Sequence, residues 1–206
     1  MIYDARALVA VQRRLRNLGL SFYPASESKR IGSDSIVIVD KVGEKILNRI
    51  SGSPSLIINV DNVGIDKAVC LALLSSMGLS APAHKLVIGI DFGKNIGFAI
   101  VADGELLHYG ISPSLHYVLS EVMWFTINLP YSELILRIGA TSGRESDALI
   151  LISKLNSILP KSAKIELVNE ESSSSNKPRR FSYVKGDARA ALNIALFSGE
   201  GIEIER

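Results

Sequence analysis

The sequence predicts an α/β protein whose larger part is a five-stranded mixed sheet flanked by helices. Short β-rich apolar runs alternate with longer segments in which apolar residues recur at helical spacing. Asp103-Gly104, between two such runs, is typical of a tight hairpin. Helical segments separate the later runs, as expected where right-handed crossovers join parallel strands. A hairpin meander followed by crossovers gives a mixed sheet.

The chain is expected to form two parts, a small α/β domain over residues 1–80 and the mixed-sheet domain over residues 85–206. The boundary follows from residues 80–84, a short run of small residues with a proline that is typical of a linker. Hydrophobic residues make up 47% of the 206 residues, and charged residues make up 21%. Each part therefore has material for a core, and long disorder is not expected.

Regular elements are expected along most of the chain. In the first part, the patterns predict helices over 5–18, 42–50 and 65–77 and strands over 35–39 and 56–60. In the second part, they predict strands over 86–90, 96–101, 105–111, 133–138 and 164–168 and helices from near Ser114, from Ser146 and after Gly186. The apolar stripe of the last helix consists mostly of alanines, so this helix can lie close to the sheet.

The composition favours a cytoplasmic protein with no membrane partner. The formal net charge is only +2, so any basic surface for nucleic acid must be local. The single cysteine, Cys70, lies in an apolar run and is expected to be a buried thiol, without any disulfide. The N-terminus lacks a signal-peptide core, and no apolar run approaches the roughly 20 residues that cross a bilayer.

Three acidic residues stand at the ends of predicted elements. Asp91 ends the first strand of the second part, Glu170 follows the fifth strand, and Asp187 begins the last helix. Each has an ordinary explanation when taken alone, because turn aspartates, loop glutamates and first-turn aspartates are common. Taken together, their places at strand and helix ends predict that they share one edge of the sheet.

The runs 87–100, 167–174 and 185–196 resemble the matching segments of RuvC-like and YqgF-like proteins, within the RNase H-like superfamily, over residues 86–198. The resemblance implies an RNase H-like fold, with Asp91 and two further acids as metal ligands. Gly97 is expected to leave room near the site. Asn169 is a departure, since the family has an aspartate there. Residues 1–80 carry no such resemblance.

This resemblance implies a metal-dependent endonuclease that acts on structured nucleic acid, either branched DNA or RNA. Two divalent ions about 4 Å apart can activate water and stabilise the leaving oxygen, and carboxylates hold Mg²⁺ or Mn²⁺. The hypothesis is that Asp91 bridges two ions while Glu170 and Asp187 each help to hold one. Clustered carboxylates repel one another, so at least one is expected to have a raised pKa without metal.

Cationic residues near these motifs are the candidate nucleic-acid contacts. They are Lys94, Arg144, Lys177, Arg179, Arg180 and Lys185. Arg144 follows a glycine-containing turn that leads to a helix N-terminus, which is typical of phosphate sites. The loop before Asp187 combines cations with Phe181 and Tyr183, a composition that suits phosphate contacts and base stacking, although an ordinary solvated loop has it too.

Two other functions remain open at this point. A catalytically inactive nucleic-acid-binding or scaffold protein with the same fold is favoured by Asn169. An actin-like or sugar-kinase-type nucleotide-binding protein is suggested by the glycine-aspartate turn over 89–93, although such proteins usually need two such domains. The sequence decides neither between DNA and RNA, nor whether the chain forms a homodimer, nor what residues 1–80 do.

Overall fold

The computed structural model describes the chain apart from residues 26–30, 51, 93–94, 141–144, 170–178, 200 and 205–206, with no side-chain description at 140, 145–149, 169 and 179. It divides into two compact units. The first comprises Met1–Ala81 with Asn128–Pro130, and the second comprises Pro82–Ile127 with Tyr131–Arg206. Among the described residues, no helix is long and apolar enough to cross a membrane.

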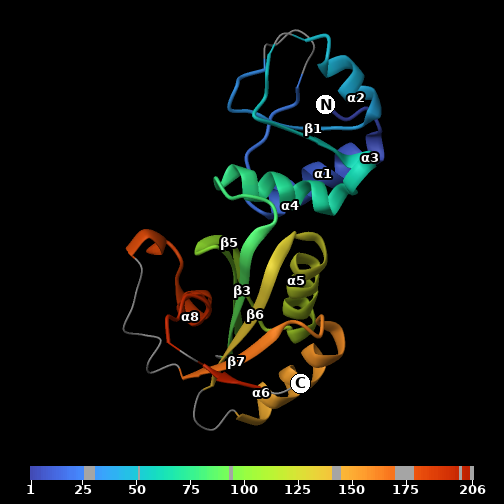
Figure 1. Ribbon diagram of the computed structural model, residues 1–206. Helices are drawn as coiled ribbons and strands as arrows, with labels where there is room; N and C mark the ends of the chain where they lie inside the picture. Colours follow the sequence, from blue (N-terminus) through green and yellow to red (C-terminus); the bar gives the residue numbers. More distant parts are fainter. Residues whose placement is uncertain are drawn as a thin grey trace. The chain divides into compact units, whose positions relative to one another are not determined.

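The first unit is a pair of parallel strands with helices. Its elements are α1 (Ala5–Asn17), β1 (Ile36–Val39), α2 (Lys41–Leu47), β2 (Leu56–Asn59), α3 (Val60–Val63) and α4 (Ile65–Ser76) (Figure 1). Strands β1 and β2 pair in parallel, with Ile36 opposite Leu56. Helix α4 packs against both strands and against α1. Cys70 on α4 is fully buried, as expected, and its burial raises the pKa of the thiol to about 12.

The side chain of Asp40 connects the end of β1 to neighbouring segments. Its buried carboxylate accepts backbone N–H bonds from Tyr3 (2.6 Å), Asp4 (2.9 Å) and Gly43 (2.6 Å). Burial by itself raises the pKa of this carboxyl, but the bonds from Gly43, Asp4 and Tyr3 outweigh it and hold the pKa below its ordinary value. One side chain therefore joins the first residues of the chain, the end of β1 and the start of α2.

An Asp40→Asn variant is expected to lower the free energy of unfolding of the first unit by about 3 kcal/mol, because three backbone N–H groups lose a charged acceptor. Urea denaturation followed by far-ultraviolet circular dichroism measures the loss. Fluorescence of Trp124, the only tryptophan, reports the second unit and should stay unchanged. Asp61→Asn is the control, since exposed Asp61 accepts one backbone bond, from Lys41 at 2.7 Å; equal losses in the two variants would contradict this role.

The second unit contains a six-stranded mixed sheet in the order β5-β4-β3-β6-β7-β8. Its strands are β3 (Ala83–Phe92), β4 (Ile96–Ala102), β5 (Glu105–Ser112), β6 (Tyr131–Ala140), β7 (Lys164–Asn169) and β8 (Ile202–Glu203). Strands β3, β4 and β5 pair antiparallel, β3, β6 and β7 pair in parallel, and β8 runs antiparallel to β7. The expected count of five strands was wrong, because a two-residue edge strand has no periodicity to detect. The expected linker also extends too far, since Ala83 already pairs with Tyr131.

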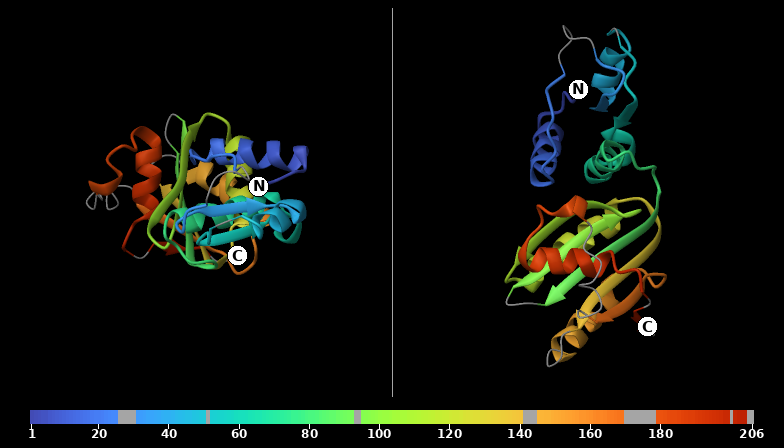
Figure 2. Two further views of the ribbon diagram at one scale, coloured as in Figure 1. Left: turned by 90° about the horizontal axis from the view of Figure 1, so that it is seen from above. Right: turned by 90° about the vertical axis from the view of Figure 1, so that its left-hand side faces the viewer.

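Helices cover both faces of this sheet. They are α5 (Leu115–Asn128), α6 (Glu145–Ile158) and α8 (Gly186–Ala195), with a short 3₁₀ turn, η1, at Arg179–Phe181. Helix α5 lies on one face and α8 on the other, where α8 runs across the strands (Figures 1 and 2). The crossovers through α5 and α6 advance in the same direction along the sheet, so right-handed connections place both helices on one face.

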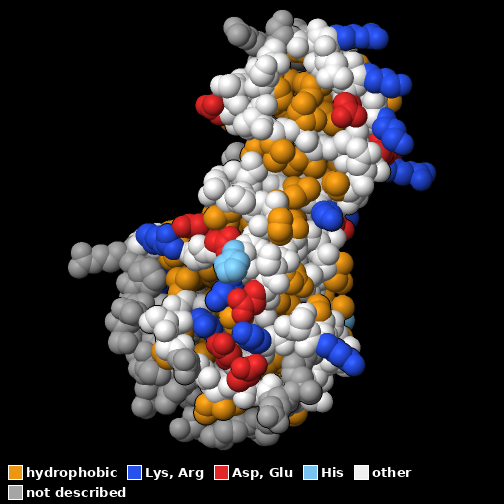
Figure 3. Space-filling model, viewed as in Figure 1, with side chains coloured by type: hydrophobic (Ala, Val, Ile, Leu, Met, Phe, Trp, Pro, Cys, Tyr) orange, Lys and Arg blue, Asp and Glu red, His pale blue; other side chains and the backbone are white. Residues whose placement is uncertain are grey.

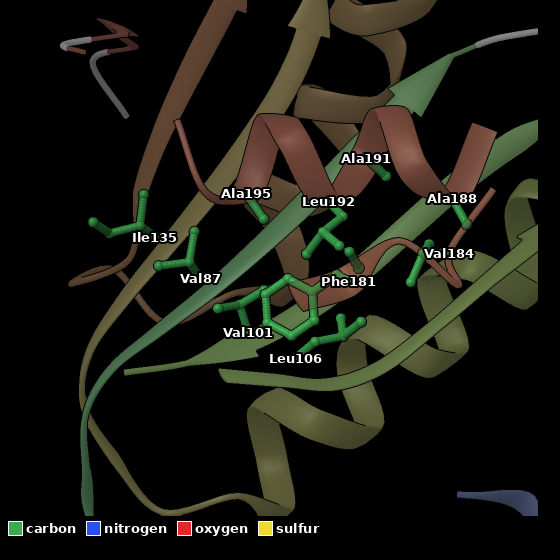
Figure 4. Packing of buried hydrophobic residues seen from close by; sticks show 11 residues of the cluster. Val87, Val101, Leu106, Ile135, Phe181, Val184, Ala188, Ala191, Leu192 and Ala195 are labelled. Atoms are coloured by element: carbon green, nitrogen blue, oxygen red, sulfur yellow. The ribbon is translucent and has the colours of Figure 1, made fainter. Parts of the chain in front are cut away.

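Small residues let α8 approach the sheet closely. A Cβ added to Gly89 would lie 2.1 Å from the Ala191 carbonyl oxygen and 2.7 Å from the Ala195 nitrogen. Beneath the helix, a buried cluster joins strands, η1 and α8 (Figure 4). Its members are Val87, Ala99, Val101, Leu106, Ile135, Phe181, Val184, Ala188, Ala191, Leu192 and Ala195. The alanine stripe therefore brings the backbone of α8 into contact with that of the sheet.

Candidate functional site

Asp91 projects from the sheet on the face that α8 covers. It lies near the C-terminal end of β3, is 5% exposed, and stands opposite Gly97 on β4. A Cβ on Gly97 would lie 2.1 Å from the Asp187 carbonyl oxygen, so it would point at α8. Directly opposite residues of an antiparallel pair share a face. The side chain of Asp91 therefore lies on the α8 face.

Asp187 meets the same part of the sheet from above. It is a half-buried residue in the first turn of α8, and its backbone packs on Gly97. Gly186 before it has a φ of 60°, a left-handed conformation that glycine adopts readily as the chain turns into the helix. Opposite residues in an antiparallel ladder are about 4.5–5.5 Å apart. Asp91 and the backbone of Asp187 therefore both lie beside Gly97, at one end of the β3–β4 pair. The room expected beside Gly97 is filled by the backbone of Asp187.

The third expected acid, Glu170, lies outside the described residues, but the strand before it is described. Strands β3, β6 and β7 run in register, with Ile90 opposite Ile138 and Ile138 opposite Leu167. Strand β7 ends at Asn169, which pairs with Ala140. The C-terminal ends of three parallel strands therefore meet at the edge that carries Asp91.

The described donors fit a divalent cation in part. In the described part of the chain, which omits Glu170, no three His, Cys, Asp or Glu side chains gather into a group that could hold a metal ion. Asp91 and Asp187 are two acidic residues beside Gly97, and Mg²⁺ is commonly held by one or two carboxylates together with waters and substrate phosphates. The raised pKa expected for one of the acids stays a prediction.

The six candidate phosphate contacts differ in what the structure shows of them. Lys94, Arg144 and Lys177 lie outside the described residues. Arg179 opens η1, and its side chain is not described. Lys185 is exposed and directly precedes α8, two residues before Asp187.

Arg180 is held at the far end of the β4–β5 hairpin. Its guanidinium donates to Glu105 Oε1 at 2.7 Å and to the Gly104 carbonyl oxygen. Gly97 lies near the start of β4 and Gly104 follows its end, so the structure does not bring Arg180 to the acids.

The sequence reasoning missed Arg137, which anchors the other end of α8. Arg137 projects from β6 and donates to Glu166 Oε2 at 2.7 Å. It also donates to the carbonyl oxygens of Ala195 (3.0 Å) and Phe197 (2.5 Å). A cation at a helix C-terminus is favourable because carbonyl groups are unsatisfied there. Arg137 thereby fixes the helix that carries Asp187; a charge inside an apolar strand was the only sequence signal.

Other described charged residues on the α8 face of the sheet are mixed in sign. Glu133 lies between Lys85 (3.4 Å) and Lys164 (3.1 Å), and the hydrogen bond from Lys164 lowers its pKa. Figure 3 shows acidic and basic side chains side by side on the described part of this unit. This ladder of paired charges does not form a basic surface for nucleic acid.

A cavity of about 510 Å³ lies in the first unit, and Asp91 and Asp187 do not line it. It is lined mainly by apolar side chains of α1, β1 and residues 20–25, among them Leu8, Val11, Ile36 and Ile38. The acids instead lie on the sheet of the second unit, near the start of α8.

Comparisons with known proteins give little further guidance. No protein-family model matches the chain, and no curated protein matches it. A solved structure that the chain resembles is Marinitoga piezophila Argonaute in complex with a 5′ OH guide RNA and target DNA. The match has a TM-score of 0.30 and 14% identity, and it covers 82% of this chain but only 38% of the Argonaute chain. Such a match carries no functional argument, and the resemblance to RuvC-like and YqgF-like proteins stays a prediction.

Proposed function

We propose that the second unit is an RNase H-like, metal-dependent nuclease that hydrolyses phosphodiester bonds in structured nucleic acid. One observation carries the proposal: Asp91 on β3 and Asp187 on α8, nearly a hundred positions apart in sequence, reach the same face and the same end of the sheet. Glu170, which directly follows the described end of β7, is proposed as the third carboxylate on the strength of the sequence.

The elements that carry the acids suit this role. Asp91 lies on a central strand of the sheet, and Asp187 lies on a helix whose two ends are fixed by Gly97 and Arg137. Side chains on packed strands and helices are positioned more exactly than side chains on loops. Bound Mg²⁺ or Mn²⁺ would activate water and neutralise charge on the reacting phosphate. Lys185, exposed and two residues before Asp187, would contact a neighbouring phosphate as a point charge.

The test is a cleavage screen with Mg²⁺ and Mn²⁺ over a four-way junction, a flap, duplex DNA and structured RNA. Wild-type protein is expected to cleave at least one of them, and a chelator should abolish cleavage. Asp91→Asn and Asp187→Asn should each slow cleavage by roughly 1000-fold, about 4 kcal/mol of transition-state stabilisation. Glu203→Gln, an exposed carboxylate in the same unit, is the control and should retain full activity. Metal-dependent cleavage that survives Asp91→Asn would refute the assignment.

A second candidate is a nucleic-acid-binding protein without activity. Asn169 favours it, because a neutral amide stands at the described end of β7 where the related proteins have an acid. Nucleic-acid binding without cleavage of any substrate, together with no effect of Asp91→Asn on calorimetric Mn²⁺ binding, would select this candidate.

A further inference from the structure

Two tyrosines form an exposed aromatic surface on the α8 face of the sheet. Tyr109 on β5 is 39% exposed, and Tyr183, which precedes α8, is 58% exposed. Their ring centroids lie 6.2 Å apart, with the rings tilted by 54°. Exposed Ile111 extends this surface toward the start of α8, since a Cβ added to Gly186 would lie 3.5 Å from its Cδ1.

The strand register places this tyrosine surface close to the acids. Ile111 stands opposite Gly97, and Gly97 stands opposite Asp91, so the three residues form one row across neighbouring strands. Neighbouring strands are about 4.8 Å apart, which puts Ile111 roughly 10 Å from Asp91 along the row. Tyr109 lies two residues before Ile111 on β5 and therefore on the same face. Asp187 sits over Gly97, between the tyrosine surface and Asp91.

Both tyrosine rings are exposed, although Tyr183 also meets the ring of Phe181 edge-on, with centroids 6.5 Å apart. Phe181 is only 5% exposed and belongs to the buried cluster together with Val184, so these two residues anchor the segment before α8. Of the two aromatic residues for which the sequence left base stacking open, Phe181 is used in packing. Tyr183, between Phe181 and Val184, projects outward instead. Adjoining exposed aromatic rings differ from single exposed apolar side chains, because contiguous exposed patches mark interaction sites.

We infer that Tyr109 and Tyr183 form a stacking surface for an unpaired base of the nucleic acid whose scissile phosphate lies at Asp91 and Asp187. This inference rests on the proposed function. Aromatic rings accept any base because every base has a π face, and a cation beside them holds the backbone. Lys185 supplies that cation, since it is exposed and lies between Tyr183 and Asp187 in the chain. The substrate class is thus nucleic acid with a single-stranded segment next to the cut, rather than continuous duplex.

The test compares two fluorescent DNA probes, a blunt duplex and the same duplex with a single-stranded thymidine overhang. Binding is measured by anisotropy with Mg²⁺ in the Asp91→Asn background, which prevents cleavage. Tyr109→Ala and Tyr183→Ala should each weaken overhang binding by about 10-fold, the range expected for loss of base stacking, and leave duplex binding unchanged. Tyr109→Phe and Tyr183→Phe should stay within about 2-fold of the parent, because the ring is kept. Tyr23→Ala is the matched control, on a 90% exposed tyrosine of the first unit.

The outcomes separate this inference from the proposed function. Alanine variants that bind the overhang as well as the parent would overturn the inference, and so would phenylalanine variants that lose as much as alanine variants. If Tyr109→Ala and Tyr183→Ala cleave the substrate as fast as the wild type does, the stacking surface is refuted, while the proposed nuclease activity stands. Tyrosine-dependent overhang binding without any cleavage would support the stacking surface and refute the nuclease. Tyrosine-dependent self-association in light scattering, without overhang binding, would show a contact between copies and overturn the inference.

Discussion

Gly89→Ala is expected to destabilise the second unit by about 3 kcal/mol or more. The added Cβ would lie 2.1 Å from the Ala191 carbonyl oxygen and 2.7 Å from the Ala195 nitrogen, far inside van der Waals contact. Both neighbours are backbone atoms of α8, so no side chain can rotate away, and the helix must move off the sheet. Overpacking of a core typically costs 1–3 kcal/mol even where side chains can adjust.

Trp124 fluorescence during urea denaturation measures this effect in the second unit. Ser182→Ala, at an exposed position of the same unit, is the control, and the stability of this variant should change by less than about 0.5 kcal/mol. If Gly89→Ala is as mild as Ser182→Ala, α8 does not lie in direct contact with β3, and the placement of Asp187 over Gly97 loses its support.

Much of the second unit could be predicted because its signals are local. The Asp103-Gly104 turn indicates the hairpin, and Asp103 adopts the positive φ of 48° that such a turn requires. The alanine stripe of the last helix indicates a close approach to the sheet. Only the structure shows that the backbone of α8 packs on Gly89 and Gly97. Strand β8 was missed because two residues cannot display an alternating pattern.

The candidate site was less accessible from the sequence because its contacts are distant in the chain. The sequence groups Arg180 with nearby cations as a phosphate contact, but its hydrogen-bond partner Glu105 lies 75 positions away in the chain. Tyr109 gave no signal, since β5 has no clean alternation of apolar and polar residues around it. Phe181 and Tyr183 looked equivalent in sequence, and only packing separates a core residue from an exposed one.

His108 lies on the opposite face of the sheet, half-buried against α5. Its ring stacks on Phe125 with centroids 5.7 Å apart, and its Nε2 lies 3.6 Å from Glu121 Oε2. That separation is too long for a hydrogen bond, so the carboxylate does not offset the loss of solvation. Burial therefore lowers the pKa of His108 to about 4 from an ordinary value of 6.5, and the folded protein keeps this imidazole neutral at pH 7.

The folded state should accordingly lose stability in mild acid. Below pH 6.5, His108 binds a proton in the unfolded chain but stays neutral in the folded protein. The free energy of unfolding therefore falls as the pH drops toward 4. At roughly 1.4 kcal/mol per pH unit, the interval from pH 6.5 to pH 4 corresponds to at most about 3.5 kcal/mol. A His108→Gln variant has no imidazole at this position and should lack this loss of stability. Any loss that the wild type and His108→Gln share comes from other titrating groups, such as carboxyl groups. Urea denaturation at pH 7 and pH 4.5, followed by Trp124 fluorescence, measures the difference. A wild type that loses no more stability than His108→Gln would mean that Glu121 pairs with a protonated His108 in the folded protein, and that attraction to the carboxylate outweighs burial.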